Sequence, residues 1–311
     1  MMRVFSAPKA IVLMYHRVVD LGRDPFWLHV RPDHFVEHLD VLRSTCDVVP
    51  LHEIRTPGSG RRRVAITFDD GYDDNLAVAA PALADAEVPA TVFIVSDLLA
   101  GTRAFWWDRL EHQILDGQNA GIIELDLPGN PLRVDLRTAE RRDRALHALG
   151  SLLRPMSTTA RESVLDQLAA QTGVVNGHCG CHAHLDHQGI VALANSPGIS
   201  IGAHTRSHAC LAALDPAAQR AEIAGSRRAL ESAVGRPVPT FAYPYGSYDS
   251  WNRSTVAAAR DSGVSMAVTT ITGDVSRTTS RFAVPRIAVR GVDRAQFVDQ
   301  LGVWFQGGRT E

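Results

Sequence analysis

The chain has 311 residues, of which 45% are hydrophobic and 21% are charged, a composition typical of globular rather than disordered proteins. Its 32 Lys and Arg side chains nearly balance its 34 Asp and Glu side chains, and the formal net charge is −2. This balance argues against nucleic-acid binding through bulk positive charge. No apolar run approaches the about 20 residues that a membrane-spanning helix needs, so no transmembrane segment is expected.

The first apolar run, residues 10–14, is shorter than the core of a signal peptide and leads into Tyr15 and His16 without a small-residue cleavage site. We therefore expect a buried first strand and a cytoplasmic protein. The four cysteines are expected to be reduced thiols in that compartment. They are Cys46, Cys179, Cys181 and Cys210.

Short apolar runs alternate with helical patterns along most of the chain. Strands are predicted over residues 10–14, 64–68, 90–95, 199–203, 238–242 and 264–269, with a weaker one over 282–289. Helices are predicted over residues 74–86, 216–234 and 251–262. Strands separated by helices imply parallel pairing with right-handed crossovers. The pattern predicts an α/β fold.

The stretch from about residue 101 to 195 interrupts this alternation and is interpreted as a helical insertion within one domain, with helices over 138–153 and 159–172. Trp106 and Trp107 at its start suggest either a sugar-stacking wall or a helix docked onto the core. A segment rich in His and Cys, residues 178–187, suggests either a second metal site or a loop with incidental metal affinity, and the latter is favoured because its spacing fits no standard zinc module.

Two adjacent carboxylates, Asp69 and Asp70, follow the predicted strand over 64–68 and precede Gly71. Side by side at a buried strand end they repel each other unless a cation or a proton lies between them. A solvated Asp-Gly turn is the alternative interpretation. The pair is a candidate for chemistry.

His204 and His208 follow the strand over 199–203, and Tyr243-Pro244-Tyr245-Gly246 follows the strand over 238–242. In a parallel barrel the carboxyl ends of all strands open onto the same face. Two imidazoles and a carboxylate form a metal-ligand set that leaves positions open for water and substrate. The Pro-Gly turn can present a backbone N–H to a cleft, or it can be an ordinary aromatic turn.

Three segments in this order resemble the motifs of the polysaccharide deacetylases, the family-four carbohydrate esterases with a NodB-homology domain. They are residues 67–71, 204–208 and 243–246, and the opening Leu13-Met14-Tyr15-His16-Arg17-Val18 is similar to the branch acting on exopolysaccharides. The resemblance implies a distorted parallel (β/α)7-type barrel. We therefore expect a single domain over residues 1–311 that carries the helical insertion.

By motif position, the resemblance implies that Asp69 is the catalytic base and that the metal ligands are Asp70, His204 and His208. It also implies that the backbone N–H of Tyr245 stabilises the oxyanion and that the ion is divalent, most often Zn²⁺. The chemistry agrees with these roles, because a metal lowers the pKa of bound water to about 7.

The sequence departs from the family pattern in two places. Ala242 stands where the family has an Arg, and no Leu-x-His segment near the C-terminus supplies the usual acid. His16 is our candidate acid, the alternative being a histidine that holds the first loop by hydrogen bonds. Arg286 is a candidate to replace the missing Arg by orienting Asp69, the alternative being a plain surface arginine.

The sequence therefore predicts a metal-dependent hydrolase of carbon–nitrogen amide bonds. Its expected substrate is an N-acetylated amino sugar in a cell-surface polysaccharide, its precursor or a glycoconjugate. A deformylase or another non-peptide amide hydrolase of the same fold is one alternative. A catalytically silent glycan-binding module is another, although binding alone needs no free carboxylate such as Asp69 beside a metal.

Overall fold

The structure is a computed structural model that describes residues 10–56, 60–100, 104–119, 121–127, 130–174 and 183–308. Contacts between Cα atoms divide the chain into two compact units. One comprises Met1–Gly101 with Leu185–Glu311, and the other is Thr102–His184. None of the helices within the described ranges is both long enough and apolar enough to span a membrane.

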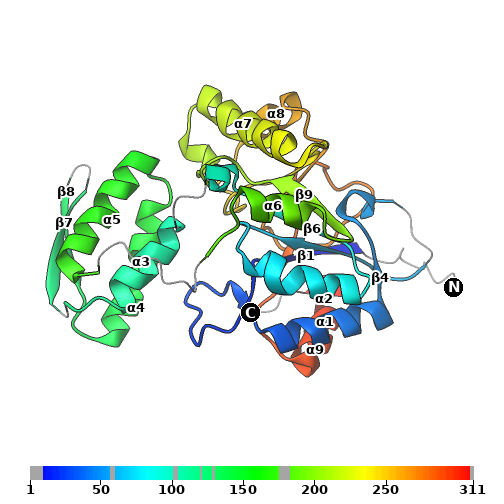
Figure 1. Ribbon diagram of the computed structural model, residues 1–311, viewed down its shortest axis with the longest axis horizontal. Coiled ribbons are helices and arrows are strands. Elements are labelled where there is room, and N and C mark those ends of the chain that lie inside the picture. The colour runs from blue at the N-terminus through cyan, green and yellow to red at the C-terminus, as the bar shows by residue number, and fades with distance from the viewer. Residues whose placement is uncertain are drawn as a thin grey trace, which may run out of the picture. The chain divides into compact units, whose positions relative to one another are not determined.

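The first unit is built on a parallel sheet in which successive strands are neighbours (Figure 1). The seven strands are β1 (Ala10–Tyr15), β5 (Arg63–Phe68), β6 (Ala90–Ile94), β9 (Ile199–Ala203), β10 (Thr240–Ala242), β11 (Met266–Val268) and β12 (Ile287–Ala288). β12 pairs back onto β1, and Val284 just before it bridges to Val268 in β11. The predicted (β/α)7-type barrel is confirmed.

Strands β1, β5 and β6 are buried along their whole length, as expected of parallel strands covered on both faces. One glycine is needed for this packing. A Cβ on Gly202 in β9 would lie 2.3 Å from the ring of Phe93 in β6, so only glycine leaves room for that ring. The short strand β4 (Asp47–Val48) pairs in parallel with the start of β5.

Helices cover the strands. They are α1 (Pro32–Thr45), α2 (Ala80–Asp85), α6 (His187–Ala194), α7 (Pro216–Val234), α8 (Arg253–Asp261) and α9 (Arg294–Phe305). In Figure 1, α7 and α8 lie on one side of the strands, and α1 and α9 on the other. α7 has the predicted bounds because Asp215 accepts hydrogen bonds from the first helical N–H groups and Gly235, at φ +68°, ends the helix.

Two features of this unit differ from the sequence-based prediction. The helix expected over 74–86 begins as a π-helical turn, η2 (Asn75–Ala79), and continues as α2. Pro81 lacks an N–H and cannot donate back to Ala77, which is consistent with a break in the regular helix here. Helices α1, α6 and α9 are not among the predicted helices.

The second unit contains three helices and a hairpin. The helices α3 (Trp106–Leu115), α4 (Ala139–Leu153) and α5 (Thr158–Thr172) pack together. An antiparallel hairpin, β7 (Ile122–Leu127) and β8 (Asn130–Asp135), joins them, so this insertion is not wholly helical. Gln167 and Gln171 of α5 each exchange hydrogen bonds with the backbone of β7, which satisfies that exposed strand edge.

Both tryptophans at the start of α3 are buried within the second unit. Trp107 stacks on Phe105 at 4.4 Å, and the guanidinium of Arg161 lies 5.1 Å from the Trp106 ring. The indoles therefore pack in a core and do not form an exposed sugar-stacking wall. Half of the His- and Cys-rich segment over 178–187, residues 178–182, lies outside the described residues, so that hypothesis stays a prediction. Cys46 and Cys210 are buried free thiols.

A buried histidine ties α1 to the segment that precedes α9. His38 lies fully buried and stacks on Phe297 with ring centroids 3.9 Å apart. Its Nε2 lies 2.8 Å from the carbonyl oxygen of Val292, which can only accept, so Nε2 carries the proton. Nδ1 then accepts from the Tyr15 hydroxyl at 3.3 Å. Burial lowers the pKa of His38 to about 4.

The burial of His38 predicts that the folded protein becomes less stable in mild acid. Between pH 6.5 and pH 4 the unfolded chain protonates His38 and the folded protein does not, so acid favours unfolding. The contribution is about 1.4 kcal/mol per pH unit, or about 2 kcal/mol between pH 6.5 and pH 5. Urea unfolding at pH 7 and pH 5 should show that His38→Gln loses this part of the pH dependence. An unchanged pH dependence in His38→Gln would show that His38 is not responsible.

Candidate metal centre and active site

All of the candidate residues except Arg286 lie at the carboxyl ends of barrel strands. Asp69 and Asp70 follow β5, His204 and His208 follow β9, Tyr245 follows β10, and His16 follows β1; Arg286 lies just before β12. Since all of these strands run parallel, their carboxyl ends share one face. Residues separated by more than two hundred positions in the sequence are thereby brought into one region.

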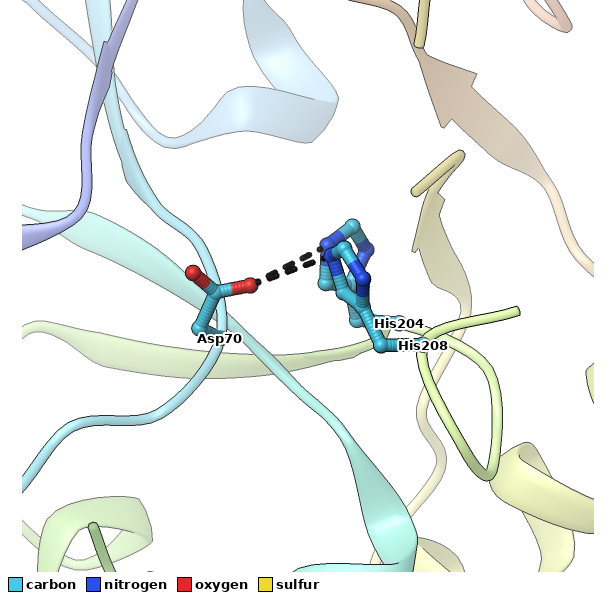
Figure 2. Close-up of side chains that lie close together, drawn as sticks. All are labelled: Asp70, His204 and His208. Carbon is cyan, nitrogen blue, oxygen red and sulfur yellow. Dashed lines mark ion pairs between the residues drawn. The ribbon is translucent and has the colours of Figure 1, made fainter. Parts of the chain in front are cut away.

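Asp70 faces both histidines (Figure 2). Its Oδ1 lies 3.5 Å from Nε2 of His204 and 3.4 Å from Nε2 of His208. One ligand atom from each of the three residues lies within 4.8 Å of the others, and all three side chains are buried. Asp70 is only 3% exposed, and its buried Oδ1 has no hydrogen-bond partner among the described residues.

These distances fit a shared divalent ion. Two ligand atoms at zinc-ligand distances of about 2.1 Å, at a tetrahedral angle, lie about 3.4 Å apart. A buried carboxylate oxygen without a partner is costly, and a cation between Asp70 and the two imidazoles would remove that cost. The donor set, two imidazole nitrogens and one carboxylate, is of a type that binds Zn²⁺.

The orientation of His204 suits metal binding. Its Nδ1 lies 2.8 Å from the carbonyl oxygen of Ala242, which fixes the proton on Nδ1 and leaves the Nε2 lone pair facing Asp70. Burial lowers the pKa of His204, but the nearby carboxylates of Asp70 and Asp69 outweigh burial and raise it overall. The imidazole thus lies in an environment that attracts positive charge.

Backbone strain concentrates at this face. Six non-glycine residues of the described chain have positive φ, and four of them belong to the site. They are Asp70 (φ +75°), Thr205 (φ +61°), His208 (φ +55°) and Tyr245 (φ +62°). Each such conformation costs about 1–3 kcal/mol and persists only where the surroundings enforce it. Such strain is typical of functional sites.

The structure brings Asp69 together with Arg286. The terminal nitrogens Nη1 and Nη2 of Arg286 donate to the two carboxylate oxygens of Asp69 at 2.7 and 2.6 Å, and both side chains are buried. Arg286 also donates from Nε to the Thr269 carbonyl oxygen at 2.9 Å and from Nη1 to Thr67 Oγ1 at 3.1 Å. It is therefore not a surface arginine, and its guanidinium holds both carboxylate oxygens of Asp69.

Asp69 is anionic at neutral pH. Burial raises the pKa of its carboxyl, but the charge of Arg286, the charge of His204 and the hydrogen bonds from Arg286 together hold it well below its ordinary value. Asp69 therefore places a fixed negative charge beside the candidate metal site.

His16 lies on the same face, half-buried, at the end of β1. Burial raises the pKa of the Asp69 and Asp70 carboxyls, but opposing charges and hydrogen bonds, among them the charge of His16, lower it overall. The loop itself is held by other groups. Asn75 donates from Nδ2 to the His16 carbonyl oxygen at 2.8 Å, and a buried Arg17–Asp74 ion pair of 2.9 Å lies next to it.

Tyr245 packs against the metal-ligand candidates. Its ring makes an edge-to-face contact with His208 at a centroid distance of 4.8 Å. The Thr270 hydroxyl donates to the Tyr245 carbonyl oxygen at 2.6 Å. This contact and the positive φ place the Tyr245 backbone beside the site.

The residues that hold the loops around the site were not predicted from the sequence. Arg17 lies in the opening segment over 13–18, and Asp74 comes shortly after the segment over 67–71. Each could have been noticed as a charge placed near a strand end. Glu222 of α7, which binds the turn carrying the two histidines, gives no such signal because a glutamate on a helix is usually a solvent-exposed residue.

Comparisons with known proteins agree with this geometry. Residues 57–128 and 140–267 match the family described as polysaccharide deacetylase. A protein of Bacillus subtilis (strain 168), YxkH, whose name describes it as a polysaccharide deacetylase, is 34% identical over 106 residues. That alignment covers 34% of this chain and 37% of the relative.

Solved structures share the fold. The Streptococcus pyogenes deacetylase PplD, in complex with acetate, has a TM-score of 0.61 at 18% identity, with 94% of this chain and 98% of that chain covered. A de-N-acetylase from Aggregatibacter actinomycetemcomitans has a TM-score of 0.57 at 15% identity, with 92% and 95% covered. The family match extends over more than half of the residues, and the chain belongs to the polysaccharide deacetylase family, a family of hydrolases of N-acetyl amide bonds.

Proposed function

We propose that this protein is a metal-dependent deacetylase that removes the acetyl group from an N-acetylated amino sugar. The substrate class is a cell-surface polysaccharide, its precursor or a glycoconjugate. One observation carries the proposal: Asp70, His204 and His208 converge on one point while anionic Asp69 lies next to them on the same barrel face. The acetate complex of PplD and the de-N-acetylase among the structural neighbours support the choice of acyl group.

Asp70, His204 and His208 would hold the ion, and Zn²⁺ is the best fit to two imidazoles and one carboxylate. A bound divalent ion supplies Lewis acidity and makes water a nucleophile near neutral pH. The two adjacent aspartates therefore have separate tasks. Asp70 is a ligand, and Asp69 remains free of the ion because Arg286 holds both of its oxygens.

Proton transfers are assigned to Asp69 and His16. Asp69 accepts the proton of the attacking water, in an orientation set by Arg286. The Tyr245 backbone N–H contributes to stabilising the oxyanion that forms from the acetyl carbonyl. His16 donates a proton to the departing amine, which leaves poorly as an anion. The products are acetate and the free amino sugar.

The first prediction concerns the metal. Incubation with a chelator should abolish acetate release from an N-acetylglucosamine oligomer, and added Zn²⁺ should restore it. The reason is that a site without its ion lacks the Lewis acid that activates water. Acetate is measured by an enzyme-coupled assay. Activity that persists after complete metal removal contradicts the proposal. An N-formyl oligomer in parallel distinguishes a deformylase, and binding of the oligomer without any release would indicate a glycan-binding module.

The second prediction concerns the base. Asp69→Asn should lower kcat about 10²–10⁴-fold, the usual contribution of a general base, while Zn²⁺ still binds. Asp70→Asn serves as the matched control, because it removes a ligand and should lose the metal. Metal content is measured by atomic absorption alongside acetate release. Near-normal turnover by Asp69→Asn would refute the role assigned to Asp69.

The third prediction concerns the buried ion pair. Arg286→Met leaves the Asp69 charge buried without its partner, which should lower the free energy of unfolding by about 3–5 kcal/mol. The double variant Asp69→Asn/Arg286→Met removes both charges and should be more stable than Arg286→Met alone. Urea unfolding of the variants measures this difference. A double variant less stable than Arg286→Met would show that the uncompensated charge of Asp69 is not what destabilises Arg286→Met.

A further inference from the structure

The turn that carries the two candidate metal ligands is bound by a side chain from α7. Glu222 Oε2 accepts hydrogen bonds from the backbone N–H of Arg206 at 2.8 Å and of Ser207 at 3.0 Å. Its Oε1 accepts from the Ser207 hydroxyl at 3.0 Å. A single carboxylate thus holds three donors, all of them located between His204 and His208.

The opposite side of the same turn is held by backbone groups. The N–H of Ser96 donates to the Thr205 carbonyl oxygen at 3.1 Å, and the N–H of Asp97 donates to the Arg206 carbonyl oxygen at 2.9 Å. These donors begin the 3₁₀ helix η3 (Ser96–Ala100), which follows β6. The turn is therefore held between η3 on its carbonyl side and Glu222 on its N–H side.

This support coincides with the strained part of the turn. Thr205 and His208 both have positive φ, a conformation that side-chain-bearing residues avoid, and Thr205 is β-branched and fully buried. The two backbone N–H groups that Glu222 binds lie directly between them. Without the carboxylate, these N–H groups would lose their partner, and a relaxed turn would move the imidazoles relative to each other.

The ion pair next to this turn is a weaker candidate for holding the backbone between His204 and His208. Arg206 pairs with Asp97 at 3.4 Å, but both side chains are about half exposed, and such pairs contribute little. The Arg206 chain lies against α7 at Gly225, where a Cβ would come within 2.7 Å of Arg206 Cδ. That contact brings the turn close to the helix, but it does not act on the N–H groups between the ligands.

We propose that Glu222 is a positioning residue that holds His204 and His208 in the arrangement needed to bind a divalent ion. The carboxylate touches neither the ligand atoms nor the reacting groups, and it acts through the backbone between the ligands. The inference rests on the proposed function only in requiring that the site binds metal. It makes no use of the substrate or of the acyl group.

The test is a Zn²⁺ titration of the metal-free protein and its variants in competition with a chromophoric chelator, with thermal unfolding of the same metal-free samples. Glu222→Ala should weaken Zn²⁺ binding about tenfold or more, in the range found when groups that support metal ligands are removed. Glu222→Gln retains an acceptor oxygen of the same reach and should bind Zn²⁺ within about threefold of the unaltered protein.

Glu231→Ala is the matched control. Glu231 lies on the same helix and also binds a backbone N–H, that of Val238 at 3.1 Å, but far along the helix from the turn. It should alter thermal stability and leave Zn²⁺ affinity unchanged. If Glu222→Ala does not fold, Glu222→Asp decides the question, because it keeps the charge but withdraws the carboxylate by one methylene and should weaken binding.

Several results would overturn the inference. Zn²⁺ affinity unchanged in Glu222→Ala, or in Glu222→Asp where that variant decides, would show that the turn keeps its shape without the carboxylate. Equal losses in the Glu222 and Glu231 variants would mean that the effect is general destabilisation. Failure of the unaltered protein to bind Zn²⁺ would also overturn it. Failure to release acetate, with Zn²⁺ affinities as expected, would count against the proposed function alone.

Discussion

The site depends on the burial of two neighbouring carboxylates, Asp69 and Asp70, at the end of one strand. Their charges repel, and neither is solvated, so each needs its own cation. Asp69 has the guanidinium of Arg286 on both oxygens, whereas Asp70 faces the imidazoles of His204 and His208. The two carboxylates thereby have different surroundings, which suit the roles we propose for them, Asp69 as proton acceptor and Asp70 as metal ligand.

The barrel supplies the rest of the arrangement. Groups that follow β5, β9 and β10 meet because parallel strands end on one face, and Arg286, just before β12, reaches Asp69 through its side chain. The loops that follow these strands adopt backbone conformations that non-glycine residues disfavour. Positive φ angles occur at Asp70, Thr205, His208 and Tyr245. In the turn over 205–208, hydrogen bonds from other elements, such as those of Ser96 and Glu222, hold the backbone in this conformation.

The residues that meet at the candidate site could be predicted because their types are unusual at strand ends, as at Asp69, Asp70, His204 and His208. Arg286 could only be suggested, since its contact with Asp69 spans 217 positions and depends on how the ring of strands closes. Glu222 could not be predicted, because its sequence context resembles that of Glu231 on the same helix. The unpredicted helices α1 and α9 do carry a helical spacing of buried residues, Phe35, Leu39 and Leu42 in α1 and Phe297, Leu301 and Trp304 in α9.

The most direct test of this account is to locate the metal. Crystals of the protein grown with Zn²⁺ should show, in data collected at the zinc absorption edge, an anomalous peak about 2.0–2.2 Å from Asp70 Oδ1 and from Nε2 of His204 and His208. Asp69 should remain paired with Arg286 and outside bonding distance of the ion. A peak elsewhere, for example within the His- and Cys-rich residues 178–187, together with none between these three side chains, would contradict it.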